Sequence, residues 1–355
     1  MPHLFEPLTL RSVTLPNRVG VSPMCEYSAD DGFANDWHLV HLGSRAIGGA
    51  GLVVTEAAAV EERGRITAKD LGLWKDAHVE RLSGIVRFLD VHGAVPGVQL
   101  AHAGRKASTR VPWEDGTGVP PEAGGWEPIA PSALAFSERT LTPRAMSLDD
   151  IAEVTRAFAS AVRRSLAAGF RLVELHFAHG YLVHEFLSPL SNRREDTYGG
   201  GFEQRIRLAL EIARAARAEW PERLPLLARL SCSDWADGGW TLEESVELAR
   251  RLGAEGVDLV DCSSGGLVPY ARIEAVPGYQ VPFARAVRAG AGVPTAAVGL
   301  ISTPAQADAI VREGDADLVM LARAMLRDPY WALHAAAELG HPEARRIPVQ
   351  YQRAF

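Results

Sequence analysis

The chain has 355 residues, of which 47% are hydrophobic and 23% are charged, and its formal net charge is −7 at pH 7. This ordinary globular composition allows a large buried core, and the negative balance without a dense Lys/Arg cluster argues against non-specific nucleic-acid binding. The three cysteines (Cys25, Cys232 and Cys262) are widely spaced and form no Cys-x-x-Cys pair. We therefore expect neither a disulfide framework nor a cysteine-held zinc or iron–sulfur centre.

The N-terminal segment shows no basic region followed by an apolar run, so no secretory signal peptide is expected. No uninterrupted apolar run approaches the ~18 residues that a membrane-spanning helix needs. We therefore expect no membrane association and a cytoplasmic location.

Short apolar runs alternate with longer segments of helical period along the chain. Continuous apolar strands are typical of a parallel sheet buried on both faces, and their alternation with helices predicts βαβ units. The expected strands are Arg18–Ser22, Leu52–Thr55, Val95–Leu100, Leu172–Leu175, Leu226–Leu230, Val257–Cys262, Thr295–Val298 and Leu318–Leu321. The expected helices include Ala77–His92, Ser147–Ala168, Phe202–Trp220, Thr241–Gly253, Pro304–Arg312 and Pro329–Leu339. Eight such units predict an α/β fold of the closed (β/α)8 TIM-barrel type, with residues 1–355 as a single domain.

One connection, from Ala103 to Ala145 after the third strand, is too long for a simple loop and is rich in proline and glycine. A segment of this length inside a compact domain is usually a functional excursion. Both a lid over the C-terminal end of the barrel and a plain surface insertion are consistent with its length.

Polar or otherwise unusual residues stand at nearly every expected strand end, where (β/α)8 enzymes gather their chemistry. In chain order these are Ser22-Pro23-Met24-Cys25-Glu26-Tyr27, Glu56-Ala57, Gln99 with His102 and Arg105, His176 with His179 and Tyr181, Arg229, Ser263-Ser264-Gly265-Gly266, Gly299, and Ala322-Arg323. A single Gln or Arg at a strand end commonly has only a structural role as a hydrogen-bonding residue. The presence of such residues at all eight strand ends is what indicates a functional site.

The fourth strand end carries the densest set of chemical groups. His176 and His179 can direct two hydrogen-bond donors at one oxygen, and Tyr181 adds a hydroxyl for proton transfer. This trio predicts an enzyme that polarises a carbonyl or nitro group and protonates the neighbouring carbon. A zinc site with His184 or Glu185 as a further ligand, and a purely structural role for both histidines, are the alternatives.

The last two strand ends indicate a phosphate site. Backbone N–H groups after Gly299 and around Ala322-Arg323 can open helices whose N-termini bind an anion, although a tight turn explains the same residues. No Gly-x-Gly-x-x-Gly motif follows a strand, which disfavours a Rossmann-type nicotinamide site and favours a mononucleotide. Cys25 fits a small buried hydrophobe, a nucleophile, or a residue that tunes a redox-active ring.

Taken together, these residues resemble the old yellow enzyme family of FMN-dependent ene-reductases, and in particular its bacterial NADPH dehydrogenase and xenobiotic reductase branch. The matching motifs cover nearly the whole chain: Leu4-Phe-Glu-Pro-Leu8, Pro16-Asn-Arg18, Ser22-Pro-Met-Cys25-x-Tyr27, Gln99-Leu-Ala-His-Ala-Gly-Arg105, Glu174–Tyr181, His184–Arg193, Tyr198-Gly-Gly200 and Ala322-Arg323.

The resemblance implies that the barrel binds FMN non-covalently and takes hydride from NADPH or NADH. The implied cofactor-binding residues are Ser22, Pro23, Met24, Cys25, Ala57, Gln99, Arg229, Gly299, Ala322 and Arg323. Among them, Cys25 would tune the potential, and Arg229 would stabilise the anionic reduced flavin.

The resemblance also implies a reaction. Reduced FMN would transfer hydride to the β-carbon of an α,β-unsaturated carbonyl or nitro compound. His176 and His179 would bind the substrate oxygen, Tyr27 would orient the substrate, and Tyr181 would supply the proton. Arg353 would reach into a neighbouring subunit's site, which implies a homodimer or homotetramer with residues 340–355 at the interface.

Two residues depart from the family's pattern. Ala322 stands where glycine is expected, and it would be strained if the backbone there needs a positive φ. Phe355 stands where tryptophan is expected. A non-catalytic flavin-binding redox sensor and a flavin-free phosphate- or metal-dependent lyase are the alternative functions.

Overall fold

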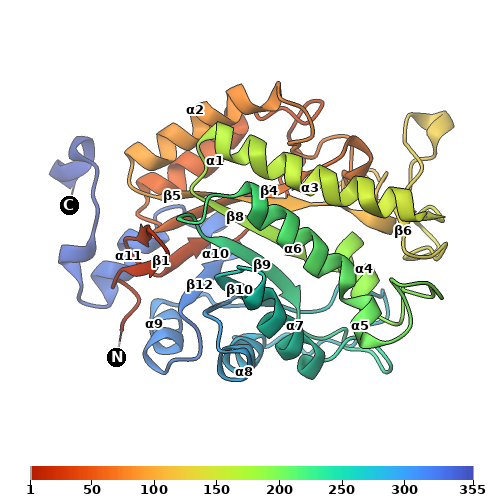
Figure 1. The fold of residues 1–355 in the computed structure, drawn as a ribbon. Coiled ribbons are helices and arrows are strands. Elements are labelled where there is room, and N and C mark those ends of the chain that lie inside the picture. The colour runs from red at the N-terminus through yellow and green to blue at the C-terminus, as the bar shows by residue number, and fades with distance from the viewer. Residues whose placement is uncertain (1, 355) are drawn as a thin grey trace.

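Eight parallel strands close into a barrel in the computed structural model, which describes residues 2–354 (Figure 1). Each barrel strand pairs with the next barrel strand along the chain, and the last barrel strand pairs with the first. The barrel strands are β3 (Val19–Val21), β4 (Leu52–Ala59), β5 (Val95–Ala101), β8 (Leu172–Phe177), β9 (Leu226–Ser231), β10 (Leu259–Ser263), β11 (Thr295–Ala297) and β12 (Leu318–Leu321). All eight overlap the expected strands, so the predicted (β/α)8 barrel is confirmed.

Helices surround the barrel (Figure 1). They are α1 (Asp36–Ile47), α2 (His78–Val91), α3 (Leu148–Ala168), α4 (Leu182–Leu187), α5 (Phe202–Arg205), α6 (Arg207–Glu219), α7 (Leu242–Ala254), α8 (Val281–Ala291), α9 (Pro304–Arg312), α10 (Arg323–Arg327) and α11 (Trp331–Glu338). Within residues 2–354, no helix combines the length and apolar character needed to cross a membrane.

One expected helix, Phe202–Trp220, is wrong as a single element. It is divided into α5 and α6 at Ile206. Arg205, at the end of α5, donates to the Leu187 carbonyl and pairs with Glu244. These partners lie far away in the sequence, so the helical period of the segment does not reveal the break.

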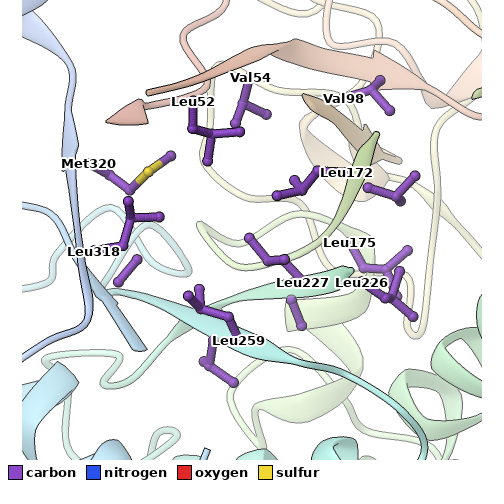
Figure 2. Packing of buried hydrophobic residues seen from close by; sticks show 14 of the residues in the cluster. Leu52, Val54, Val98, Leu172, Leu175, Leu226, Leu227, Leu259, Leu318 and Met320 are labelled. Atoms are coloured by element: carbon purple, nitrogen blue, oxygen red, sulfur yellow. The ribbon is translucent and has the colours of Figure 1, made fainter. Parts of the chain in front are cut away.

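The core of the barrel is apolar (Figure 2). The side chains of Leu52, Val98, Leu172, Leu259 and Leu318 come from five different strands, and each has an exposed fraction of 0%. Fully burying one such side chain stabilises the fold by roughly 1.5–3 kcal/mol relative to leaving it in water. Continuous apolar strands therefore hold the barrel closed.

A short hairpin of β1 (Leu8–Leu10) and β2 (Val13–Leu15) packs at the N-terminal end of the barrel strands. At its turn, Arg11 Nε donates to Asp258 Oδ1 at 2.6 Å, and the Ser12 N–H donates to the Arg223 carbonyl at 3.1 Å. Asp258 and Arg223 precede β10 and β9. The hairpin thus covers the end of the barrel opposite to the one where the polar strand ends gather.

The long excursion after β5 contains two short 3₁₀ turns, η2 (Gly104–Lys106) and η3 (Pro121–Ala123), and the paired strands β6 (Ile129–Ala130) and β7 (Arg144–Ala145). It is fastened to the segment after β4: the Thr109 N–H donates to the Ile66 carbonyl, and Trp126 Nε1 donates to the Arg63 carbonyl. The excursion therefore belongs to the C-terminal end of the barrel. The C-terminus of the chain lies on the other side of the molecule (Figure 1).

A reciprocal cap starts α3 directly after this excursion. Ser147 Oγ accepts from the Asp150 N–H at 3.1 Å, and Asp150 Oδ2 accepts from the Ser147 N–H at 2.8 Å. We expect Ser147→Ala to lower the free energy of unfolding by ~1 kcal/mol, because an N–H of the first turn loses its acceptor. Urea unfolding measures this. Thr155→Ala, which removes a hydroxyl bonded to the Ile151 carbonyl inside the same helix, is the control, and an equal loss in both variants would contradict the capping role.

Candidate active site

Strand pairing brings the polar strand ends together. Gln99 on β5 lies opposite Glu174 on β8, and two residues further along β8, His176 lies opposite Arg229 on β9. Arg229 in turn lies opposite Asp261 on β10. Because neighbouring strands are ~4.8 Å apart, these side chains form one connected layer at the C-terminal end of the barrel.

This layer contains a buried charge cluster. Gln99 Nε2 donates to Glu174 Oε1 at 2.7 Å, and Arg229 Nε lies 3.1 Å from Asp261 Oδ2. Burial, reinforced by the charge of Asp261, raises the pKa of Glu174 to about 8, and burial also raises the pKa of Asp261. Two carboxyl groups therefore share one guanidinium, and the cluster retains a proton at neutral pH.

Glu174 and Asp261 were not among the predicted site residues. The signal that points to them is an acidic residue inside an otherwise apolar, fully buried strand, since such residues are almost never buried without a partner.

Several buried polar atoms of this region have no hydrogen-bond partner among residues 2–354, namely Ser22 Oγ, Glu174 Oε2, His176 Nδ1 and Asp261 Oδ1. An unsatisfied buried polar group costs ~1–3 kcal/mol, so the presence of these atoms in one layer favours a polar ligand there. A flavin ring, with donors and acceptors along one edge, fits this set.

The end of β3 leads into a half-buried segment in which Pro23, Met24, Cys25 and Tyr27 follow the buried Ser22. Burial, together with the negative charges of Asp70 and Glu56, raises the pKa of the Cys25 thiol well above its usual value. Cys25 therefore remains a thiol at neutral pH, which disfavours the nucleophile interpretation.

Tyr27 and Ala57 add an aromatic and a small residue to this end of the barrel. Tyr27 has a left-handed backbone (φ 48°), and its ring meets the Trp113 ring of the excursion edge to face at 5.8 Å. Ala57 is paired with Gln99 across β4 and β5, and it lines a small cavity together with Tyr181.

The predicted trio is brought together. His176 Nε2 lies 3.4 Å from His179 Nδ1, and the ring of Tyr181 stands edge-on to the His176 ring at 5.1 Å between centroids. Burial, reinforced by the positive charge of Arg229, lowers the pKa of both histidines well below the usual value. Both rings are therefore neutral at pH 7. Burial raises the pKa of Tyr181, which keeps its proton.

The further ligands of the alternative zinc site have other partners. His184 Nδ1 accepts from the Gly180 N–H at 2.8 Å, and its Nε2 lies 2.9 Å from Asp234 Oδ1. Glu185 Oε1 accepts from the Arg105 N–H at 2.9 Å. Over residues 2–354, no group of three or more His, Cys, Asp or Glu side chains is placed to hold a metal ion.

Lys106, in the excursion, is a site residue that the sequence analysis missed. Its Nζ donates to the His179 carbonyl at 2.7 Å and also to the Gly266 carbonyl, and it lies 4.2 Å from the centre of the Phe136 ring. Burial lowers its pKa to about 7, although the charge of Glu185 opposes that shift. Lys106 thus joins the loops after β5, β8 and β10. Two other side chains of the excursion contribute: Phe136 contacts Lys106, and Trp113 contacts Tyr27.

The predicted phosphate residues line one pocket. Gly299, Ala322 and Arg323, together with Ser263, surround a cavity of about 400 Å³. Gly299 has φ +119°, and a Cβ there would lie 2.8 Å from Gln280 Nε2, so glycine is required. Ala322 has φ −105°, so the strain considered for alanine at this position does not arise.

Arg353 is not brought to the other predicted residues. It lies exposed in the 3₁₀ turn η5 (Val349–Ala354), and the C-terminus lies on the side of the molecule away from the excursion (Figure 1).

Comparison with known proteins gives consistent matches over the whole barrel. The profile of the NADH:flavin oxidoreductase / NADH oxidase family matches residues 3–341. An NADPH dehydrogenase from Geobacillus sp. (strain WCH70) is 49% identical over 354 residues, which cover 99% of this chain and 98% of that protein. Morphinone reductase superposes with a TM-score of 0.79 at 26% identity, covering 96% of this chain and 90% of that one. An old yellow enzyme homologue from Zymomonas mobilis has the same fold (TM-score 0.79, 23% identity, 98% and 100% covered).

The raised pKa of Glu174 makes stability depend on pH. Its carboxyl titrates near 4.5 when unfolded and at about 8 when folded, so the folded state holds the extra proton between these values. The free energy of unfolding therefore falls as pH rises through this window, by up to ~1.4 kcal/mol per pH unit. We expect Glu174→Gln, which keeps an acceptor for Gln99, to flatten this fall. Urea unfolding at pH 5.5 and 7.5 measures it, with the exposed Glu243→Gln as control, and a variant curve parallel to the wild-type curve would refute the assignment.

Proposed function

Because this chain belongs to the NADH:flavin oxidoreductase / NADH oxidase family, we propose that it reduces the activated C=C bond of α,β-unsaturated carbonyl or nitro compounds. The chain is an oxidoreductase that uses FMN and a nicotinamide cofactor, and the expected membership of the old yellow enzyme family is confirmed. The flavin-free lyase alternative is thereby set aside. The observation that carries the proposal is the neutral pair His176 and His179, 3.4 Å apart, with Tyr181 beside them.

The residues present fit FMN, and we propose which of them hold it. Ser22 Oγ offers a buried donor without a partner among residues 2–354, Arg229 offers a buried guanidinium, and the pocket at Gly299 and Arg323 suits a phosphate. The full proposed set is Ser22, Pro23, Met24, Cys25, Ala57, Gln99, Arg229, Gly299, Ala322 and Arg323. When bound, FMN supplies the two-electron chemistry between NADPH or NADH and the substrate.

In this proposal, the protein's own groups handle the oxygen and the proton. His176 and His179 each offer one N–H to the substrate oxygen, and they stabilise it as it gains negative charge. Removing one such preorganised donor typically costs ~10²–10³-fold in rate. Tyr181, which burial keeps protonated, donates the proton to the α-carbon. Tyr27 orients the substrate with its ring against Trp113.

We propose that the chain is a single domain that works as a homodimer or homotetramer. The C-terminus lies on the side of the molecule away from the excursion (Figure 1), and Arg353 belongs to η5 at that end, so in this proposal it serves a site in a neighbouring subunit, with residues 340–355 at the interface. Cys25, Cys232 and Cys262 are free, which suits the reducing cytoplasm as the place of action.

The central test is turnover. We expect purified, FMN-loaded protein to consume NADPH faster when cyclohexenone is added, with loss of the C=C bond. An unchanged rate, with no reduced product, would leave the flavin-binding redox sensor as the function.

Tyr181→Phe removes the proposed proton donor. We expect enone reduction to fall by ~10²-fold or more, because protonation of the α-carbon loses its acid, while reduction of FMN by NADPH is unchanged. Stopped-flow measurement of the two half-reactions separates these effects. A similar loss in both half-reactions would exclude this role.

Replacing both His176 and His179 by alanine removes both oxygen ligands. Each hydrogen bond to a charged oxygen contributes ~1.5–3 kcal/mol, so we expect the Kd of 4-hydroxybenzaldehyde to rise by ~10²-fold or more. A spectral titration of the FMN-loaded protein measures it, with the exposed His334→Ala as control. Unchanged affinity would refute their role as oxygen ligands.

Arg353→Ala tests the contribution in trans. We expect the KM for cyclohexenone to rise several-fold with little change in the rate of FMN reduction, because the guanidinium contacts only the substrate side of the partner's site. Gln352→Ala, one residue earlier, is the matched control. A KM unaffected by Arg353→Ala in an oligomeric preparation would count against the contact.

A further inference from the structure

The neutral ring of His179 carries one proton, and the nitrogen that holds it decides what the ring offers to a substrate. Nδ1 lies 3.4 Å from Nε2 of His176, the other ring of the proposed oxygen-binding pair. Nε2 lies 2.7 Å from Ser263 Oγ. The tautomer of His179 therefore depends on which way the Ser263 hydroxyl points.

The surroundings of Ser263 favour one direction. Gln280 Nε2 donates to the Val298 carbonyl at 3.0 Å, so Gln280 presents its Oε1 to the two serines at the end of β10. Ser264 Oγ donates to that oxygen at 2.6 Å, and Ser263 Oγ also lies within hydrogen-bond distance of it, at 3.4 Å. An amide oxygen can accept two hydrogen bonds, so the preference rests on distance: of the two acceptors that Ser263 Oγ faces, His179 Nε2 at 2.7 Å is the nearer one.

Contacts from two other segments hold the main chain of His179. Its N–H donates to Ser231 Oγ at 2.9 Å, its carbonyl accepts from Lys106 Nζ at 2.7 Å, and its φ is +60°. Burial, together with the positive charges of Arg229 and Lys106, disfavours a second proton on the ring. A neutral ring carries its single proton on either Nδ1 or Nε2.

We propose that Ser263 is a positioning residue that sets the tautomer of His179: its hydroxyl donates to Nε2, so that the proton sits on Nδ1 and is offered to the substrate oxygen. This inference deepens the proposed function and rests on it. It also connects two parts of the site, because Ser263 lines the pocket of Gly299 and Arg323 as well.

Removing the hydroxyl has a defined consequence. In Ser263→Ala, His179 Nε2 no longer accepts a hydrogen bond from a hydroxyl, so the ring proton is free to move to Nε2. His179 Nδ1 would then present a lone pair to the substrate oxygen, and this lone pair would repel the oxygen instead of binding it. We expect the Kd of 4-hydroxybenzaldehyde to rise by ~10-fold or more, since loss of a charge-assisted hydrogen bond is worth ~1.5–3 kcal/mol.

The direct experiment is ¹H–¹⁵N long-range correlation NMR of FMN-loaded protein labelled with ¹⁵N-histidine, in which the His179 signals are identified by their loss in His179→Gln. We expect the wild-type ring to be protonated at Nδ1. We expect Ser263→Ala to shift the proton towards Nε2, and Ser263→Thr, which keeps a hydroxyl, to restore both the tautomer and the affinity. Ser231→Ala is the matched control, because it removes a hydroxyl bonded to the main chain of the same histidine.

Three results would overturn the inference: an Nε2-protonated ring in the wild type, an Ser263→Ala variant with unchanged tautomer and affinity, or an equal shift in Ser231→Ala. The wild-type spectrum decides even if Ser263→Ala fails to fold. Failure of the proposed function looks different, since the wild type would then show the Nδ1 tautomer but bind no 4-hydroxybenzaldehyde.

Discussion

In the barrel, Arg229 stands between His176 on one neighbouring strand and Asp261 on the other, because the strands pair in parallel with that register. The same register sets Gln99 against Glu174. Side chains alternate between the two faces of a strand, so a slip by one residue would turn Arg229 away from the barrel interior and towards the helices. The site thus depends on closure of the whole barrel, to which all eight strands contribute.

Burying this layer is costly, and the rest of the barrel supports it. A charge taken from water into the interior is unfavourable unless it is paired, and here two carboxyl groups share one guanidinium. The leucine and valine side chains of the same strands provide the compensating stability (Figure 2). Several unsatisfied polar groups lie at this end of the barrel, where a flavin and a substrate would satisfy them.

The loop after β8 shows how strain is held at the site. His179 and Gly180 both have positive φ, and a Cβ at Gly180 would overlap the Gly266 carbonyl in the loop after β10. Such conformations persist when surrounding contacts over-determine them. Lys106 provides those contacts, since it donates to the carbonyl oxygens of both His179 and Gly266. A residue of the excursion thereby holds the main chain at another strand end, which ties the excursion to the candidate site.

The sequence by itself determined the barrel, because burial of a strand on both faces leaves a continuous apolar run that is visible locally. It also pointed to the trio His176, His179 and Tyr181, since these three stand within six residues at one expected strand end. The tertiary structure decided the rest. The contact of Ser263 with His179 joins residues 84 apart in sequence, and that of Lys106 with Gly266 joins residues 160 apart. No periodicity records such contacts, because they arise only when the barrel closes and brings the loops of different strands to the same end.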